Sequence, residues 1–367
     1  MALSPQPEKQ MIFTTILVDE ATDKINDGIV IKRYQNPWLK SEVGLRRSGV
    51  SFRMTAHEQS EYVKCALDIH YFTEKYCKVK TEDGSIDNIL LRDYQKEILD
   101  NFVSNRFNIL MASRQVGKTI SSAIFMLHKI LFDNDKNIMI VANKGDTAVE
   151  IVDKIKSIYS LLPFFLKPGI KTWNQKSLTF ENGCRIKTSA RTKTPAIGFT
   201  IDVLYLDEFA HIPSNIIEPY YTAAFPVTSA VQNSKIIITS TPNGMNMFYK
   251  LWHDAERGRN GYVPLEVHWS AVPGRDEAWK QETIRNTSER QFTQEFECEF
   301  LGSVDTLISA SKLRSMVFED PIQDNSKGLK VYEEVKSYYR EKIIGELAEA
   351  GRGNQQFTLL RGLTQLR

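Results

Sequence analysis

Cysteine is scarce in this chain. Its 367 residues include four cysteines, at positions 65, 77, 184 and 298, and no two of them form a Cys-x-x-Cys pair. The spacing indicates neither a cysteine-based zinc site nor a disulfide framework, and it favours a reducing compartment.

Long hydrophobic runs and an excess of one charge are also missing. The longest apolar run near the N-terminus, MIFTTILV, follows Glu8 and Lys9, is shorter than a membrane-spanning helix and lacks a signal-peptide arrangement. The net charge is +2 and the sequence pI is about 8.2, so bulk charge neither requires nor excludes a nucleic-acid partner. We therefore expect a cytosolic protein without membrane contact, in which any DNA-binding charge is local.

The chain does have a hydrophobic content of 42% and an alternation of strand-like and helix-like segments. This pattern runs from about Leu90 to Thr241 and contains the strand-like runs NILMA, NIMIVAN, DVLYLDE and KIIITS and the helix-like runs KTISSAIFMLHKILF and DTAVEIVDKIKSIYSLL. The segment SLTFENGCRIKTSA adds a hairpin that turns at residues 181–183. Such alternation predicts an α/β fold whose parallel sheet is flanked by helices.

The remaining segments are predicted by composition and periodicity. Residues 1–56 lack periodicity and should form an N-terminal arm, whereas apolar spacing predicts one helix from His57 to Cys77 within a helical part at 57–89. After a core at 90–243, residues 244–303 should form a small appended α+β subdomain with the strand YVPLEVHW between two helices. Residues 304–367 read as a linker and a short charged helical tail.

The stretch MASRQVGKTI carries the first chemical signal. Gly117, Lys118 and Thr119 follow a strand-like run and open a helix-like run, as in loops that bind nucleotide phosphates. Lys118 would reach the β and γ phosphates, Thr119 would ligate Mg²⁺, and backbone groups from Ser113, Arg114, Gln115 and Val116 would line the loop. The usual pattern begins with glycine, and here Ala112 occupies that position. A basic turn at the start of a surface helix is the alternative.

The run VLYLDE supplies a second signal, because four apolar residues end in two acids. Asp207 would hold Mg²⁺ at the carboxyl end of a strand, and Glu208 would orient and deprotonate the attacking water. A strand followed by a solvated acidic turn is the alternative.

Two weaker signals accompany these motifs. In LRDYQKEIL, Gln95 offers an amide to an adenine edge and Tyr94 offers a ring face, although both residues also fit an ordinary helix face. In TSTPNG, the hydroxyls of Thr239, Ser240 and Thr241 at a strand end could sense the γ phosphate.

Taken together, LRDYQ, SRQVGKT, VLYLDE and IIITSTPNG resemble the ATPase part of the large terminase subunit of tailed bacteriophages, most closely the contractile-tailed type. The resemblance covers roughly residues 61–303 and implies a RecA/ASCE-like P-loop NTPase fold. In that family the loop lacks its first glycine, so Ala112 is a family variant. The resemblance also makes Arg114 a candidate arginine finger, with pairing to a nearby acid as the alternative.

The resemblance implies a motor that uses ATP and Mg²⁺ to move double-stranded DNA into a procapsid. Its implied partners are the portal protein and the small terminase subunit, with a ring homo-oligomer when docked, in the cytoplasm of the infected host cell and not in the mature virion. Basic residues between Lys171 and Lys193 could contact DNA phosphates.

Two departures from the family pattern qualify this expectation. Ile197 stands before Gly198 where relatives often have arginine, which weakens the case for a basic sensor there. The resemblance also fades after about Lys336, where an RNase H-like nuclease normally begins, and the remaining residues are too few for that fold. We therefore expect no DNA cleavage by this chain.

Two other classes are weighed against the motor. A superfamily 2 helicase would share LRDYQ and DEFAH, but its Gln-x-x-Gly-Arg-x-x-Arg motif does not occur after Asn243. An ATP-binding docking remnant would bind nucleotide without turnover, although Lys118, Thr119, Asp207 and Glu208 are all present.

Overall fold

The computed structural model describes residues 44–50, 53–80, 84–189 and 200–300, together with the backbone of two short strands, β11 (Gln323–Asp324) and β12 (Lys330–Val331). The chain divides into two compact units, residues 1–303 and 304–367, and β11 pairs antiparallel with β12 in the second. The predicted arm up to residue 43 and the predicted tail helix lie outside the described residues, as do Ile197 and Gly198.

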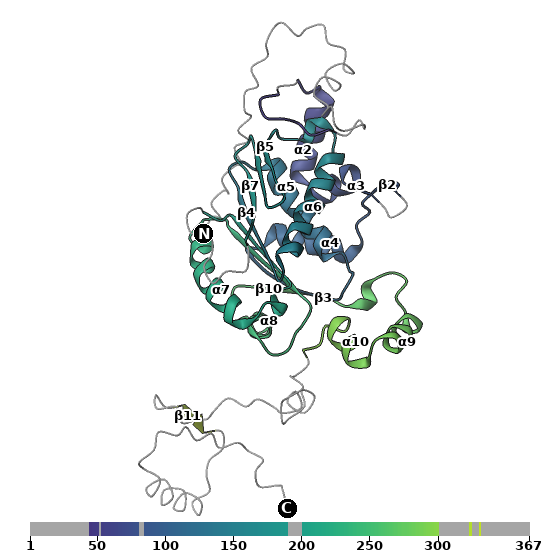
Figure 1. Ribbon diagram of the computed structural model, residues 1–367, viewed down its shortest axis with the longest axis vertical. Coiled ribbons are helices and arrows are strands. Elements are labelled where there is room, and N and C mark those ends of the chain that lie inside the picture. Colours follow the sequence, from purple (N-terminus) through teal and green to yellow (C-terminus); the bar gives the residue numbers. More distant parts are fainter. Residues whose placement is uncertain are drawn as a thin grey trace, which may run out of the picture. The chain divides into compact units, whose positions relative to one another are not determined.

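An eight-stranded sheet organises the first unit (Figure 1). Its strand order is β10-β3-β9-β8-β4-β7-β6-β5, where the strands are β3 (Phe107–Ala112), β4 (Asn137–Ala142), β5 (Ile170–Trp173), β6 (Ser177–Phe180), β7 (Arg185–Ser189), β8 (Val203–Asp207), β9 (Lys235–Ser240) and β10 (Val263–Val267). Strands β10 to β7 pair in parallel, and only β7-β6 and β6-β5 are antiparallel. The prediction of an α/β fold with a mostly parallel sheet is confirmed.

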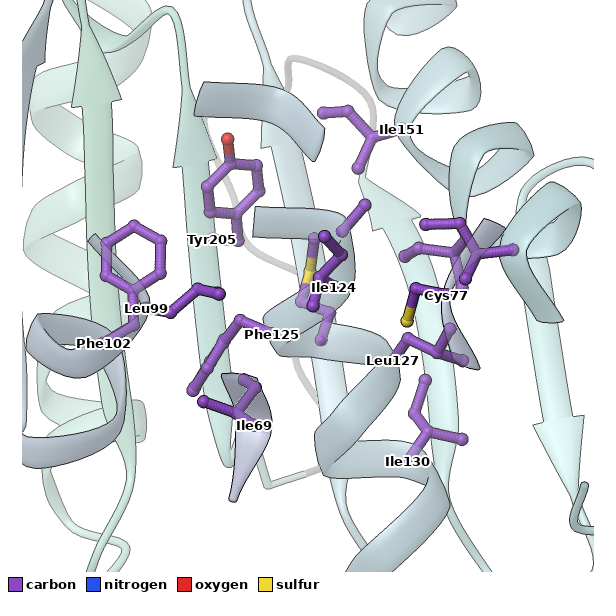
Figure 2. Packing of buried hydrophobic residues seen from close by; sticks show 14 of the residues in the cluster. Ile69, Cys77, Leu99, Phe102, Ile124, Phe125, Leu127, Ile130, Ile151 and Tyr205 are labelled. Carbon is purple, nitrogen blue, oxygen red and sulfur yellow. The ribbon is translucent and has the colours of Figure 1, made fainter. Parts of the chain in front are cut away.

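Helices cover both faces of the sheet, which explains why its central strands are apolar without alternation. One face packs against α4 (Asp93–Ser104), α5 (Lys118–Phe132) and α6 (Gly145–Leu161), and this core contains alternate strand residues such as Ile140 and Tyr205. Figure 2 shows Tyr205, Ile124 and Phe125 within it. The other face packs against α7 (Ser214–Ser229) and α8 (Met247–Glu256), with Val141 and Leu206 from the same strands.

The predicted helix from His57 to Cys77 is wrong, because the structure has two helices there. These are α2 (Ala56–Leu67) and α3 (Ile69–Tyr76), and Asp68 separates them with extended backbone. The Asp68 side chain accepts hydrogen bonds from the N–H groups of His70 and Tyr71, so it caps a new helix rather than continuing the old one. A short hairpin of β1 (Lys78–Lys80) and β2 (Ile86–Asn88) follows.

The strand expected in an appended subdomain lies instead in the central sheet. β10 pairs in parallel with β3, and its Val267 aligns with Ala112 at the start of the phosphate loop. Parallel pairing joins segments that are distant in sequence, which local periodicity does not reveal. The helices that follow, α9 (Glu277–Asn286) and α10 (Glu289–Glu295), pack through Trp269, Trp279, Phe292 and Phe296.

Within the described residues, no helix is both long and apolar enough to cross a membrane.

Candidate nucleotide site

The carboxyl ends of three neighbouring strands bring the sequence motifs together. In the sheet register, Leu110 of β3 aligns with Thr239 of β9, which aligns with Asp207 of β8. Adjacent strands lie about 4.8 Å apart, so Asp207 is roughly 10 Å from the strand that leads into the phosphate loop. This edge of a parallel sheet is where such folds bind ligands.

The phosphate loop keeps its shape without an initial glycine. Ala112 is the last residue of β3 and is fully buried, and its φ is not positive, so its Cβ requires no unusual backbone. Positive φ values occur later, at Gln115 (57°) and Gly117 (84°). A Cβ on Gly117 would also overlap the Gln95 amide, so this glycine is the one that the loop requires.

The N–H groups of the loop fall into two sets. Ser113 N–H donates to the Val267 carbonyl at 2.9 Å, and Arg114 N–H donates to the Glu295 carbonyl at 3.0 Å. Those of Gln115, Val116 and Gly117 have no acceptor among the residues that the structure describes. Three successive unpartnered N–H groups before a helix form a ready anion site.

Lys118 joins the two predicted motifs directly. Its ammonium donates to Oε1 of Glu208, although the two residues are 90 positions apart. Glu208 has a left-handed backbone, with φ 51° and ψ 40°, at the turn after β8. That conformation is uncommon outside glycine, and here it accompanies a side chain directed at the lysine of the phosphate loop.

Asp207 is buried beside this pair. The Thr239 hydroxyl donates to its Oδ1 at 2.7 Å, and the Glu208 N–H also donates to the carboxylate. Burial raises the pKa of Asp207, while the Lys118 charge opposes that rise. Asp207 makes no ion pair with any residue in the described ranges.

The other strand-end hydroxyls tie β9 to the turn after β8. Ser240 Oγ accepts a hydrogen bond from the Ala210 N–H at 3.1 Å, and Thr241 Oγ1 lies 2.8 Å from His211 Nε2. The same imidazole nitrogen is 3.6 Å from Oε2 of Glu208, and burial lowers the pKa of His211. A path of polar contacts therefore links Glu208 to Thr241 through His211.

Arg114 is held by an acid in this structure. Its guanidinium contacts the Glu295 carboxylate through Nε at 2.5 Å and Nη2 at 3.0 Å. The pairing raises the pKa of Arg114, which stays charged. Of the two readings of Arg114, the contact with an acid is the one seen here, and a role as an arginine finger stays a prediction.

Gln95 and Tyr94 lie at the start of α4, next to the loop. Gln95 Oε1 accepts a hydrogen bond from the Arg92 N–H at 3.1 Å, and its amide nitrogen lies against Gly117. Tyr94 accepts a hydrogen bond from the Arg92 guanidinium at 2.8 Å. The Gln95 oxygen is thus already engaged, and adenine recognition by these residues stays a prediction.

Three residues at the site were not predicted from the sequence: His211, Arg275 and Glu295. Arg275 donates to the loop carbonyls of Arg114 and Gln115 at 3.0 and 3.4 Å. Only the histidine has a local signal, because it lies three residues after Glu208. Arg275 and Glu295 are more than 150 residues from the loop that they contact.

A strand, an N–H-lined loop and a helix beginning at Lys118 define a P-loop fold of the nucleotide-binding class. Residues 109–315 match the family described as "Terminase large subunit, T4likevirus-type, N-terminal". The match covers more than half of the chain, and the chain belongs to this family of phage large terminases.

Solved structures show the same fold. The large terminase of bacteriophage HK97 is 19% identical with a TM-score of 0.54, and the alignment covers 71% of this chain and 60% of that one. The ATPase domain of the Thermus phage P74-26 large terminase is 19% identical with a TM-score of 0.43, covering 54% and 89%. A large terminase from a thermophilic bacteriophage, in complex with ATP-gamma-S, is 14% identical with a TM-score of 0.45, covering 58% and 53%. The chain thus spans about 60% of the length of the HK97 protein.

Proposed function

We propose that this chain hydrolyses ATP with Mg²⁺ and that the reaction drives double-stranded DNA into a viral procapsid. The observation that carries the proposal is the contact between Lys118 and Glu208, which places the phosphate-binding lysine against the expected base. Family membership supplies the context of a packaging motor.

The pair suggests how binding would prepare catalysis. A carboxylate held by an ammonium is a weak base, because the positive charge stabilises its ionised form. A bound triphosphate offers Lys118 competing anionic oxygens, so Lys118 would release Glu208. Glu208 would then accept the proton of the attacking water as the γ-phosphoryl group leaves ADP.

Mg²⁺ fits the residues present. This ion prefers oxygen ligands, and the buried Asp207 carboxylate and the Thr119 hydroxyl lie at the strand end and helix start that flank the loop. When bound with nucleotide, the ion would neutralise charge on the β and γ phosphates. Asp207 has no cationic partner in contact, so its charge is available for a metal.

The first test is Mg²⁺-dependent phosphate release by the purified chain and by Glu208→Gln. The variant keeps the size of the side chain but removes the base, and we expect hydrolysis to fall by roughly 100-fold or more, with ATP binding retained. Glu218→Gln, an exposed acid on α7, is the matched control and should leave the rate unchanged.

The outcomes separate the candidate functions. Hydrolysis by the parent and not by Glu208→Gln supports the ATPase motor. Binding without hydrolysis by the parent points to a docking remnant, and unwinding of a forked duplex would point to a helicase. Metal-dependent nicking of plasmid DNA would contradict our expectation that this chain does not cut DNA.

We also propose that the outer face of β6 and β7 contacts DNA phosphates. Arg185 and Lys187 are exposed and flank the buried Ile186, so they share the face opposite to the α6 side. Lys187 aligns with Ser177 and Arg185 with Thr179, which adds hydroxyl groups to the face. The apolar core on this side of the sheet includes no residue from β5, β6 or β7.

Lys171 and Lys176 add positive charge near these strands and are exposed. The predicted DNA-contacting region also extends into residues 190–193, which lie outside the described residues. Such a surface would bind the DNA backbone without reading its sequence, as a translocating motor requires. The portal protein, the small terminase subunit, a docked ring and a location in the infected host cytoplasm remain proposals from family membership.

The DNA surface is tested by salt-dependent binding to a 30-bp duplex. If Arg185 and Lys187 each contact a phosphate, the double variant Arg185→Glu/Lys187→Glu should reduce the slope of log K against log salt by about 2. Lys154→Glu/Lys250→Glu changes the same charge on exposed positions of α6 and α8 and should leave the slope unchanged. Equal effects from both pairs would mean that only net charge matters.

A further inference from the structure

Arg275 contacts the phosphate loop from the side of the α9 helix. Its Nη1 donates to the carbonyl oxygen of Arg114 at 3.0 Å, and its Nη2 lies at a longer 3.4 Å from that of Gln115. One guanidinium therefore spans two consecutive peptide groups of the loop. Arginine suits this contact because its donors are fixed in one plane.

The geometry of the peptide bond gives this contact a consequence. In a planar trans peptide, the carbonyl of one residue and the N–H of the next point in opposite directions. The structure contains no cis peptide in the described ranges. The carbonyls of Arg114 and Gln115 face Arg275, so the N–H groups of Gln115 and Val116 face away from it.

Those N–H groups are two of the three that have no acceptor among the described residues. The side that they face is the inside of the phosphate loop, where anionic oxygens would accept hydrogen bonds. Arg275 thus holds two peptide dipoles in the orientation that favours an anion.

Arg275 is itself fixed in place. Its guanidinium carbon lies 4.7 Å from the ring centroid of Trp279 and 5.8 Å from that of Phe296. It makes no ion pair with a carboxylate in the part of the chain that the structure describes. A stacked arginine without an acidic partner also adds an uncompensated positive charge beside the loop.

We propose that Arg275 is a positioning residue for the phosphate loop, which it turns so that Gln115 and Val116 present their N–H groups to a polyphosphate. The inference rests on the proposed nucleotide site but assigns a role that is independent of Glu208. It predicts that Arg275 matters for phosphate binding more than for binding of the nucleoside.

The test compares the affinities of ATP, ADP and AMP for the full chain, measured by competition against a labelled nucleotide in Mg²⁺. Arg275→Ala should weaken ATP and ADP binding about tenfold, because charge-assisted hydrogen bonds are lost. AMP affinity should change less than twofold, and KM for ATP should rise by a larger factor than kcat falls. Arg285→Ala, on the exposed side of the same helix, is the matched control and should change nothing.

A second variant guards against loss of fold. Arg275→Lys keeps a cation beside Trp279 but cannot span two carbonyls, so it should give an intermediate loss for ATP with an unchanged melting temperature. Equal weakening of ATP and AMP, or unchanged ATP affinity in both Arg275 variants, would overturn the assignment. A parent chain that binds ATP without hydrolysis would refute the proposed motor and leave this inference standing, whereas a parent that binds no ATP would refute both.

Discussion

Two buried carboxylates in this chain have opposite surroundings. Glu61, on α2, accepts hydrogen bonds from Lys64, Lys75, Tyr71 and Tyr76 at 2.6 to 3.0 Å. Asp207, at the end of β8, receives the Thr239 hydroxyl and a backbone N–H but no cation in contact.

The pKa values follow these partners. The hydrogen bonds, led by that of Lys75, hold the pKa of Glu61 far below its ordinary value, whereas burial raises the pKa of Asp207. Glu61 is neutralised from within the protein and joins α2 to α3. Asp207 carries a charge that the described residues leave without an ionic partner, which suits a site for a metal ion and phosphate.

Removing the charge of Asp207 gives the largest expected effect. We expect Asp207→Asn to lower Mg²⁺-dependent hydrolysis by roughly 100-fold or more, because the metal loses its carboxylate ligand. Without nucleotide, the same variant should melt at a higher temperature than the parent, because the raised pKa shows that burial penalises the charged form. Calorimetry and a phosphate-release assay check the two effects. A lower melting temperature would remove the contrast with Glu61.

The same change at Glu61 should act in the opposite direction on stability. Glu61→Gln loses the charge that two lysines contact, so its melting temperature should fall at pH 7, and ATP affinity should stay the same. Because the folded-state pKa of Glu61 is depressed, its contribution is present above its ordinary pKa of 4.5 and disappears as the pH falls further. The parent and Glu61→Gln should therefore converge in acid.

Glu74→Gln is the control for that measurement. Glu74 is an exposed acid on α3 that pairs with Lys96 at 2.9 Å, and exposed pairs contribute little. A loss of stability as large as that of Glu61→Gln would show that burial does not distinguish the two acids.

Lys167 sharpens the comparison with the smallest expected effect, because it is a buried cation outside the nucleotide site. Its ammonium donates to the carbonyls of Gly44 and Ser160 at 2.7 and 2.9 Å, and burial lowers its pKa from 10.5 to about 8. The folded-state pKa is the lower one, so the charged form costs stability below pH 8, and this cost disappears as the pH rises towards 10.5.

The parent should therefore gain roughly 2 kcal/mol of unfolding free energy between pH 7.5 and 9.5 relative to Lys167→Met, since each pKa unit corresponds to about 1.4 kcal/mol. Urea unfolding at both pH values measures the difference. Parallel pH dependence in the two proteins would show that the two carbonyls fully compensate the buried ammonium.

Much of the fold could be predicted because its signals are local. The runs that became β3, α5, β4, α6, β8 and β9 each carry their own hydrophobic pattern. The position of β10 beside β3 and the break at Asp68 could not be read in the same way. The first depends on pairing between distant segments, and the second on one side chain capping a helix where periodicity continues.

The sequence by itself determined the phosphate loop and the acidic strand end, because glycine, lysine, threonine and two acids act within a few residues of backbone. Only the tertiary structure decided which charges have partners. Arg275 and Glu295 reach the loop across 161 and 181 residues, and Lys118 meets Glu208 across 90. Charge pairing depends on distance in space, which the order of residues does not specify until the sheet has aligned its strands.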